Sequence, residues 1–453
     1  MRCRRSDAVA VLVPLWLLAV PVSAEAPPPD GSFARYEGVF QLPTGRAIVL
    51  TTTGVIAELA KPVFIDWDAY RAGQLVVAAE DSLVSPDVGD PQAACQAEFS
   101  IERSADGAAA AVTVRAADLE ERRAVAAVLW YDRDVTIPGD GVHLAATLRL
   151  PAAAGSFPAV VLVHGSGPGE RSYFAVMSSY FASLGMAVLT YDKRGCGGSS
   201  GDWREVDLDV LAQDALAAAT WLATRPEIDP RRVGLWGISQ GGWITPLVAS
   251  LADGLAFVIN SSGPAVSLRR QDLFHVANML QFLEISAEDI AYCIDALNVL
   301  YDFGQGRAAA ASLDAVMDRL RDHPQLNELA VPPARELSAA SLYAKQQIGD
   351  PAWFFHMNPD HDALAPYRRL RCPTLVTYGR LDYSVPVAES VDLLAAVADS
   401  TAAGLLTVRV IADTGHGYVR MQEDNPLAPV APQTLSPDFF QTIADWLRTL
   451  GVL

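Results

Sequence analysis

The spacing of apolar residues changes at about residue 133 of the 453-residue chain. Before this point, short alternating segments separated by turn residues predict β-strands, including a hairpin over residues 97–114 that turns at residues 104–107. After it, mostly apolar runs such as residues 159–163 and 187–191 alternate with segments that repeat apolar residues at helical spacing, for example residues 208–222. This alternation predicts an α/β fold with a mostly parallel sheet and helices on both faces.

A long segment, residues 265–349, interrupts the alternation because it has several helical patterns and no strand pattern. One apolar stripe is formed by Leu273, Val276, Leu280 and Leu283. Ser286 with Asp289 resembles a capping box at the start of a further helix. An all-helical insertion between two sheet strands predicts a cap over the strand ends, where ligands bind in open α/β sheets.

The length of the chain calls for more than one compact core, and the patterns divide it into five predicted parts. These are a signal peptide (1–24), a linker (25–32), a small β-rich accessory domain (33–130), an α/β core (131–264 and 350–453) and a helical cap (265–349). The accessory domain contains no polar constellation that predicts chemistry, so its role stays open.

The first 24 residues have the anatomy of a secretory signal peptide. Arg2, Arg4 and Arg5 precede an apolar stretch over residues 8–20, and small residues at 22–24 suit cleavage after Ala24. An uncleaved N-terminal anchor is the alternative. No later run reaches the ~18 apolar residues that a membrane helix needs. We therefore expect a secreted or periplasmic protein with no membrane span after signal removal.

Composition and charge exclude several classes of function. A hydrophobic fraction of 51% against 19% charged residues excludes disorder as the main state. The formal net charge of −19 opposes binding to nucleic acid or anionic lipid, and we expect no nucleic acid as a partner. The cysteines after the signal segment have no paired metal-binding spacing; they are Cys95, Cys196, Cys293 and Cys372. We expect no metal and no cofactor, and the oligomeric state stays open.

The chemistry centres on residues 237–241, Gly-Ile-Ser-Gln-Gly, which lie between an apolar strand pattern and a helical one. In a strand–turn–helix context, G-x-S-x-G predicts a nucleophile elbow, a sharp turn that exposes the hydroxyl of Ser239. Because a serine hydroxyl is a weak nucleophile at neutral pH, this reading requires a base and an acid elsewhere in the chain.

Asp382 and His416 supply that acid and base. Each follows a predicted strand, and His416 has a glycine on either side. The order Ser239, Asp382, His416 is the nucleophile–acid–base order of one fold class and differs from the chymotrypsin and subtilisin orders. His164 and Asp413 are weaker candidates: we expect His164 to shape a loop, and Asp413 to lie in a turn or at the surface.

An acyl-transfer site also needs two backbone N–H donors for the oxyanion. We expect Gln240, the residue after the nucleophile, to supply one. The other is expected from the loop 164–168, His-Gly-Ser-Gly-Pro, which follows an early apolar strand, and Ser166 is the predicted donor.

Together, segments 164–168, 192–199 and 237–242, the Asp382 segment and Gly-His-Gly at 415–417 resemble the α/β-hydrolase superfamily. The secreted esterases and serine aminopeptidase-like hydrolases are most similar. The resemblance implies an α/β-hydrolase fold over about residues 133–264 and 350–453, and a mainly structural role for Asp192 and Arg194. Ser239 stands where haloalkane dehalogenases and soluble epoxide hydrolases use aspartate, which argues against both chemistries.

The expected function is that of a serine hydrolase that cleaves carboxylic esters of a small-molecule acyl substrate through an acyl-serine intermediate. An aminopeptidase-like enzyme is the main alternative, and it would need cap carboxylates such as Glu284, Glu288 or Asp289 to bind the substrate α-ammonium. A thioesterase or acyltransferase, and an inactive binding module that keeps the fold, are further alternatives. The sequence does not distinguish acyl or leaving groups.

Overall fold

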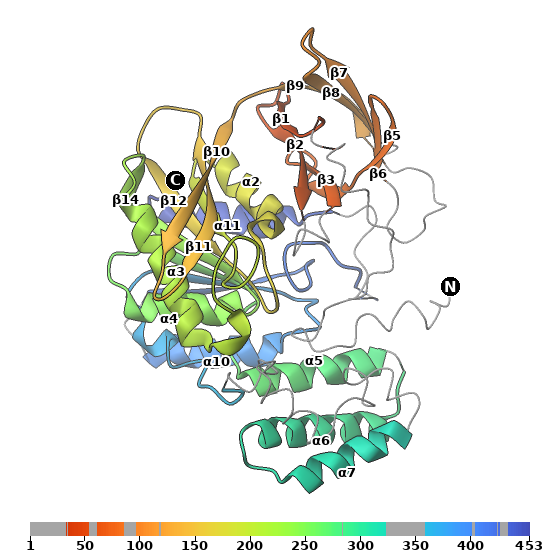
Figure 1. Cartoon of the computed structure of the whole chain (residues 1–453), viewed down its shortest axis with the longest axis vertical. Coiled ribbons are helices and arrows are strands. Elements are labelled where there is room, and N and C mark those ends of the chain that lie inside the picture. The colour runs from red at the N-terminus through yellow and green to blue at the C-terminus, as the bar shows by residue number, and fades with distance from the viewer. Residues whose placement is uncertain are drawn as a thin grey trace.

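The computed structural model describes residues 33, 35–53, 61–85, 97–116, 119–282, 284–322, 358–400, 404–423, 425 and 434–453. The predicted signal peptide and linker lie outside these residues, as does the end of the predicted cap. The described residues form two β-sheets and a group of cap helices; the N-terminal sheet and the cap helices lie at opposite ends of the view in Figure 1.

The central sheet has eight strands in the order β10-β11-β13-β12-β14-β15-β16-β17. Their bounds are β10 Trp130–Pro138, β11 His143–Pro151, β12 Phe157–Val163, β13 Ala187–Tyr191, β14 Ile228–Ile238, β15 Phe257–Ser261, β16 Thr374–Gly379 and β17 Leu406–Ile411. β10 pairs antiparallel with β11, and β11 antiparallel with β13. All the other pairs are parallel, which confirms the predicted mostly parallel sheet.

Helices cover both faces of this sheet because successive strand residues point to opposite sides. On β12, Val161 and Val163 share a buried cluster with α3 (Leu208–Ala223) and α4 (Gly241–Leu251). Their neighbours Val160 and Leu162 belong instead to a cluster with α2 (Ala175–Ser183) and α11 (Pro437–Thr449). The fully apolar strands are thus explained by burial on both faces. One further covering helix, α10 (Val387–Ser400), packs against β16.

The cap helices follow β15 and consist of α5 (Leu268–Phe282), α6 (Ala287–Gly304) and α7 (Ala310–Asp322). In the predicted stripe, Val276 and Leu280 are buried and Leu273 is partly buried, while Leu283 lies outside the described residues. Ser286 and Asp289 cap the start of α6, as predicted: the Ser286 hydroxyl accepts a hydrogen bond from the Asp289 N–H at 3.1 Å and donates one to the Asp289 carboxylate at 2.9 Å. The helical insertion between two strands of the sheet is confirmed.

The N-terminal strands form a nine-stranded antiparallel sheet in the order β4-β3-β2-β1-β9-β8-β7-β6-β5, here called the accessory sheet. Their bounds are β1 Gly38–Gln41, β2 Ala47–Thr53, β3 Lys61–Asp66, β4 Arg71–Gln74, β5 Val76–Ala79, β6 Ser82–Ser85, β7 Ala97–Arg103, β8 Ala109–Ala116 and β9 Leu119–Ala126. β7 and β8 are the predicted hairpin, and its turn is closed by a hydrogen bond of 2.9 Å from the Gly107 N–H to the Ser104 carbonyl.

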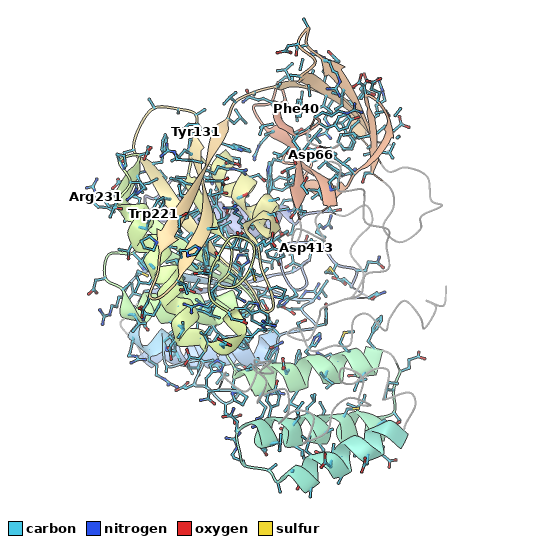
Figure 2. All side chains as sticks on the ribbon, viewed as in Figure 1. Phe40, Asp66, Tyr131, Trp221, Arg231 and Asp413 are labelled. Atoms are coloured by element: carbon cyan, nitrogen blue, oxygen red, sulfur yellow. The ribbon has the colours of Figure 1, made fainter. Side chains whose placement is uncertain are left out.

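The accessory sheet has two different faces. Ile48 and Leu50 of β2 pack with Phe40 in a core that belongs to the accessory sheet alone (Figure 2). The alternating residues Ala47 and Val49 share a buried cluster with α2 and α11 of the central domain. The period of two along β2 therefore assigns one face to the accessory core and the other to the central domain.

Trp67 is the main side chain at this contact. It is 2% exposed, and its indole N–H donates to the hydroxyl of Ser179 on α2 at 3.1 Å. The ring lies 5.5 Å from Tyr180 and 5.1 Å from Phe440, between centroids. The accessory sheet is thereby tied to the two helices that cover one face of the central sheet.

We expect Trp67→Ala to lower the free energy of unfolding by about 3–5 kcal/mol, because it opens a cavity between the accessory sheet and the central domain. Urea denaturation followed by tryptophan fluorescence and circular dichroism measures this loss. Tyr131→Ala serves as the control, because Tyr131 is 45% exposed on β10 (Figure 2) and its truncation should cost well under half as much. Equal losses for the two variants would contradict the proposed role of Trp67.

Candidate active site

Ser239 lies directly between β14 and α4, as the G-x-S-x-G pattern predicts. Its φ of 57° is in the left-handed region, which non-glycine residues rarely adopt. The flanking glycines allow the turn to pack closely. A Cβ at Gly237 would lie 2.5 Å from the carbonyl oxygen of Gly241, and one at Gly241 would lie 2.6 Å from that of Val163. The turn is strained and crowded, and it leaves Ser239 partly exposed.

The loops after β16 and β17 bring a carboxylate and an imidazole together. Oδ2 of Asp382 lies 2.9 Å from Nδ1 of His416. The other carboxylate oxygen accepts hydrogen bonds from the backbone N–H groups of Ser384 and Val385, at 2.8 and 3.1 Å. The Asp382 side chain is fully buried, so these contacts fix its orientation.

The same contacts determine which nitrogen of His416 can act as a base. Because Asp382 accepts from Nδ1, the neutral ring carries its proton there and presents a lone pair at Nε2. Nε2 is buried and has no hydrogen-bond partner among the described residues. Burial lowers the pKa of His416, but the charge and hydrogen bond of Asp382 outweigh it and raise the pKa above its ordinary value.

Strand topology places the three predicted residues at one edge of the sheet. β14, β16 and β17 run parallel, so their carboxyl ends, followed by Ser239, Asp382 and His416, share that edge. A Cβ at Gly417 would lie 3.7 Å from Ile238, beside Ser239. No hydrogen bond joins Nε2 of His416 to the Ser239 hydroxyl among the described residues. Such contacts are often long in unliganded sites and tighten with substrate.

The two predicted oxyanion donors, Gln240 and Ser166, belong to segments that adjoin Ser239. Gln240 is buried and forms the N-cap of α4, at the positive end of the helix dipole. Ser166 lies in the loop after β12, whose neighbouring Gly165 lies against the nucleophile: a Cβ at Gly165 would be 3.4 Å from Cβ of Ser239. Both segments therefore adjoin the serine, as an oxyanion site requires.

The two weaker candidates have other contacts. His164 is buried, and its Nε2 lies 2.7 Å from the carbonyl oxygen of Tyr191. Burial lowers its pKa to about 3, so the ring is neutral and holds its loop in place. Asp413 accepts a hydrogen bond from the Ser436 hydroxyl at 2.7 Å and pairs with Arg420 at 2.9 Å. Asp413 thus stabilises the start of α11 (Figure 2).

Comparison with known proteins identifies the family. The model of the alpha/beta hydrolase family matches residues 160–433, more than half of the chain. The chain belongs to the alpha/beta hydrolase family. This confirms the resemblance and the fold class predicted from the sequence, and it supports a hydrolase.

The relatives of this alpha/beta hydrolase include esterases. The chain is 27% identical over 269 residues to the esterase EstD of Thermotoga maritima, covering 56% of the chain and 52% of that protein. It is 38% identical over 104 residues to the thiohydrolase aneE of Aspergillus aculeatus, covering 23% and 32%. The Pyrococcus furiosus esterase Pf2001 is a structural neighbour with 16% identity and a TM-score of 0.44, covering 71% of this chain and 91% of that one. The chain spans about half the length, or less, of these curated relatives.

The loop after β13 contains a residue that sequence reasoning missed. Asp192 and Arg194 have structural contacts, as the resemblance implies. Asp192 accepts hydrogen bonds from the backbone N–H groups of Gly198 in the same loop and of Arg171 just before α2. Arg194 forms a buried two-point pair with Asp214 on α3. Lys193 lies between Asp192 and Arg194 in the sequence. It donates hydrogen bonds to Gly165 and Gly167 in the loop after β12 and to Gln240, the residue after Ser239. The sequence contains one hint that Lys193 is special: lysine is rare in this chain, with only three lysines among the 34 basic residues.

A second missed feature is the attachment of α5 to the acid loop. Gln271, His275 and Asn278 lie on one face of α5 and contact residues 383–384, at 3.0, 3.2 and 3.1 Å respectively. Burial and the nearby charge of His416 lower the pKa of His275 to about 4, so its ring is neutral. The cap helix is therefore bonded to the residues that follow Asp382.

A cavity of about 400 Å³ lies between α5 and the acid loop. Its lining combines apolar and charged side chains, including Met279, Phe282, Tyr383, Arg380 and Glu423. Phe282 is 44% exposed, so an apolar ring faces solvent beside the acid loop. The cap thus adds apolar surface close to the site.

The described residues offer no group of three metal-ligating side chains. Cys196, Cys293 and Cys372 are buried free thiols, and Cys95 lies outside the described residues. No helix in the described part of the chain is long and apolar enough to cross a membrane.

Proposed function

We propose that this alpha/beta hydrolase cleaves carboxylic esters through an acyl-serine intermediate, with Ser239 as nucleophile, His416 as base and Asp382 as orienting acid. One observation carries the proposal: Nε2 of His416 is buried and unpartnered at the edge that holds Ser239, while a buried carboxylate fixes Nδ1. A histidine held in this way is prepared to accept the proton of a neighbouring hydroxyl.

The reaction would proceed in two stages. His416 takes the proton of Ser239 as its oxygen attacks the substrate carbonyl, and the N–H groups of Gln240 and Ser166 stabilise the resulting oxyanion. The imidazolium then gives that proton to the leaving alcohol, which departs and leaves an acyl-serine. His416 then takes a proton from water as the water oxygen attacks the acyl group. Collapse of the second oxyanion breaks the bond to the serine oxygen, which receives that proton from the imidazolium, so the acid is released and the serine hydroxyl is restored.

Contacts in the cap favour an ester over a peptide substrate. The cap carboxylates that could bind an α-ammonium are not arranged as a buried ammonium site. Glu284 and Glu288 are exposed, and Asp289 is hydrogen-bonded to Ser286 at the start of α6. A carboxylate that recognises an ammonium group should instead be partly buried beside the nucleophile. Thioester cleavage uses the same groups and stays as the second candidate, since one relative is a thiohydrolase.

Turnover of p-nitrophenyl esters of graded chain length, compared with aminoacyl-p-nitroanilides, tests this assignment. We expect measurable kcat/KM on the esters, and at least about 10²-fold less on the anilides. An acyl-thioester series measured with a thiol reagent separates the second candidate. Faster cleavage of the anilides would overturn the ester assignment and favour the peptidase.

We further propose that the enzyme acts outside the cytoplasm, after cleavage of residues 1–24. Support comes from the arginines, the apolar stretch and the small residues of this segment. Expression of the full chain in a bacterium, followed by fractionation and N-terminal sequencing, should give a periplasmic or secreted protein that begins at Glu25. A product that keeps Met1 in the membrane fraction would support the anchor instead.

A further inference from the structure

Lys193 occupies an unusual position beside Ser239. Its side chain is 3% exposed, and its Nζ donates to the carbonyl oxygens of Gly165 and Gly167 at 2.8 and 2.9 Å. A third hydrogen bond of 2.8 Å runs to Oε1 of Gln240. An ammonium group has three N–H donors, so this geometry uses all of them.

These acceptors belong to the two segments that carry the proposed oxyanion donors. The Gly165 carbonyl and the Ser166 N–H are opposite ends of one peptide group. A cation that bonds to the oxygen polarises that group and makes its N–H a stronger donor. The Gly167 bond holds the far side of Ser166, and the Gln240 bond ties the other segment to the same ammonium.

We propose that Lys193 is a positioning residue for the oxyanion site: its ammonium links the loop of Ser166 to Gln240 and polarises the Ser166 peptide toward the developing negative charge. This inference rests on the proposed function, because it assigns Lys193 to the acyl-transfer site of Ser239. The negative charge of the tetrahedral intermediate is the only part of the reaction that this arrangement favours, so its effect should appear in kcat.

The surroundings of Lys193 are poorly suited to a purely structural cation. No carboxylate forms an ion pair with it among the described residues, although a buried charge is costly without one. The groups facing it are the neutral His164 ring, the buried Cys196 thiol and the ring of Trp203, whose centroid lies 5.2 Å from Nζ. Burial lowers the pKa of Lys193 to about 7, while the nearby Cys196 acts in the opposite direction.

The direction of the pH effect follows from this charge. Below the pKa of Lys193 the ammonium makes all three bonds; above it, the neutral amine has two donors and no charge. We therefore expect kcat to fall partially on the alkaline side of neutrality. Protonation of His416 lowers kcat on the acid side instead. The acid limb of the pH profile therefore reports on His416 and the alkaline limb on Lys193.

The experiment compares wild type, Lys193→Met and Lys193→Arg by kcat, KM and pH profile on one p-nitrophenyl ester. In Lys193→Met, kcat should fall about 10–10²-fold with KM within about threefold, less than the ~10²–10³-fold typical of deleting an oxyanion donor itself. Lys193→Arg should recover part of this loss and abolish the alkaline fall, because arginine stays charged. Affinity for a trifluoromethyl ketone, which forms a tetrahedral adduct with the serine, should fall by the same factor as kcat.

Arg149→Met is the matched control. Arg149 is another largely buried cation of the central domain, paired with Asp132 at 2.8 Å. Its removal should reduce stability and leave kcat per labelled serine unchanged. If kcat falls equally in Arg149→Met, the loss in Lys193→Met reflects the removal of a buried cation in general. That outcome would contradict a specific role of Lys193 at the oxyanion site.

The outcomes separate this inference from the proposed function. If wild type neither hydrolyses esters nor reacts with a fluorophosphonate, the proposed function fails. If wild type does both and Lys193→Met matches it in kcat and in ketone affinity, the role of Lys193 alone is overturned. If Lys193→Met does not fold, the wild-type and Lys193→Arg pH profiles decide, and identical alkaline limbs in the two would overturn the proposal.

Discussion

Replacing Ser239 with alanine should abolish ester hydrolysis, with a loss of about 10⁶-fold in kcat, because loss of a triad serine removes the covalent route entirely. The fold should be unaffected, since alanine occupies the same volume apart from one hydroxyl. Stopped assays with p-nitrophenyl esters and thermal denaturation measure the two quantities on the same preparation. A large fall in melting temperature would mean that the serine is structural.

Ser239→Gly sharpens this prediction. Because Ser239 adopts a φ of 57°, glycine should relieve strain and raise the free energy of unfolding by about 1 kcal/mol while activity is lost. Glu284 provides the matched control, since it is exposed and has a φ of 58° between α5 and α6. Glu284→Gly should bring a similar gain in stability with unchanged ester hydrolysis. A stability loss in Ser239→Gly would contradict the strained-turn account.

Asp382→Asn should reduce kcat by about 10⁴-fold, which is the second largest effect expected. One carboxylate oxygen of Asp382 accepts two backbone N–H groups, so the asparagine carbonyl must occupy that position. Its NH₂ group then faces Nδ1 of His416, which can accept only if the ring proton moves to Nε2. His416 would then lack the free Nε2 lone pair that the proposed mechanism requires.

The same variant should change the pH profile. In the proposed mechanism the neutral form of His416 is the active one. Because Asp382 raises the pKa of His416 above the ordinary value, kcat/KM of wild type should rise with pH through this raised pKa. Without the negative charge, the residual activity of Asp382→Asn should rise at lower pH. Asp413→Asn is the control: it changes a carboxylate three residues from His416 that contacts Ser436 and Arg420, and it should keep kcat within a few-fold. A larger loss in Asp413→Asn than in Asp382→Asn would reverse the assignment of the acid.

Local patterns were sufficient to predict much of the fold. The apolar face of residues 208–222 became α3, and the Ser286 capping box begins α6, because both features depend on neighbours within one or two helical turns. Asp382 and His416 could be predicted for a related reason: each follows a strand of a parallel sheet, and such strand ends meet at one edge.

Features that depend on distant pairs could not be predicted. Lys193 contacts Gln240, 47 positions later in the chain, and no local period marks that pairing. His275 reaches Ser384 across 109 positions, and Trp67 reaches Ser179 across 112. In each case the chemistry of the side chain is ordinary and only its three-dimensional partner makes it informative. The strands of the accessory sheet could be predicted from its sequence. The face of the sheet that packs against the central domain could not.

These contacts give the site a consistent physical description. The cap is hydrogen-bonded to the acid loop through α5, and the accessory sheet is hydrogen-bonded to α2 and packs against α11. Lys193 joins the loop after β12 to Gln240, the residue after Ser239. The α5 and Lys193 contacts restrict segments next to Asp382 and Ser239, and a site held in this way needs little reorganisation during the reaction. The strain at Ser239 is then compensated by surrounding contacts.

Peptide mapping by mass spectrometry after reaction with a fluorophosphonate tests the central claim most directly. We expect a single adduct on Ser239 in the folded protein, none after denaturation, and none in Ser239→Ala. Labelling should also slow strongly in the Asp382→Asn variant, because activation of the serine depends on His416. An unlabelled folded protein, or an adduct on another residue while Ser239 stays free, would contradict the assignment of Ser239 as the nucleophile.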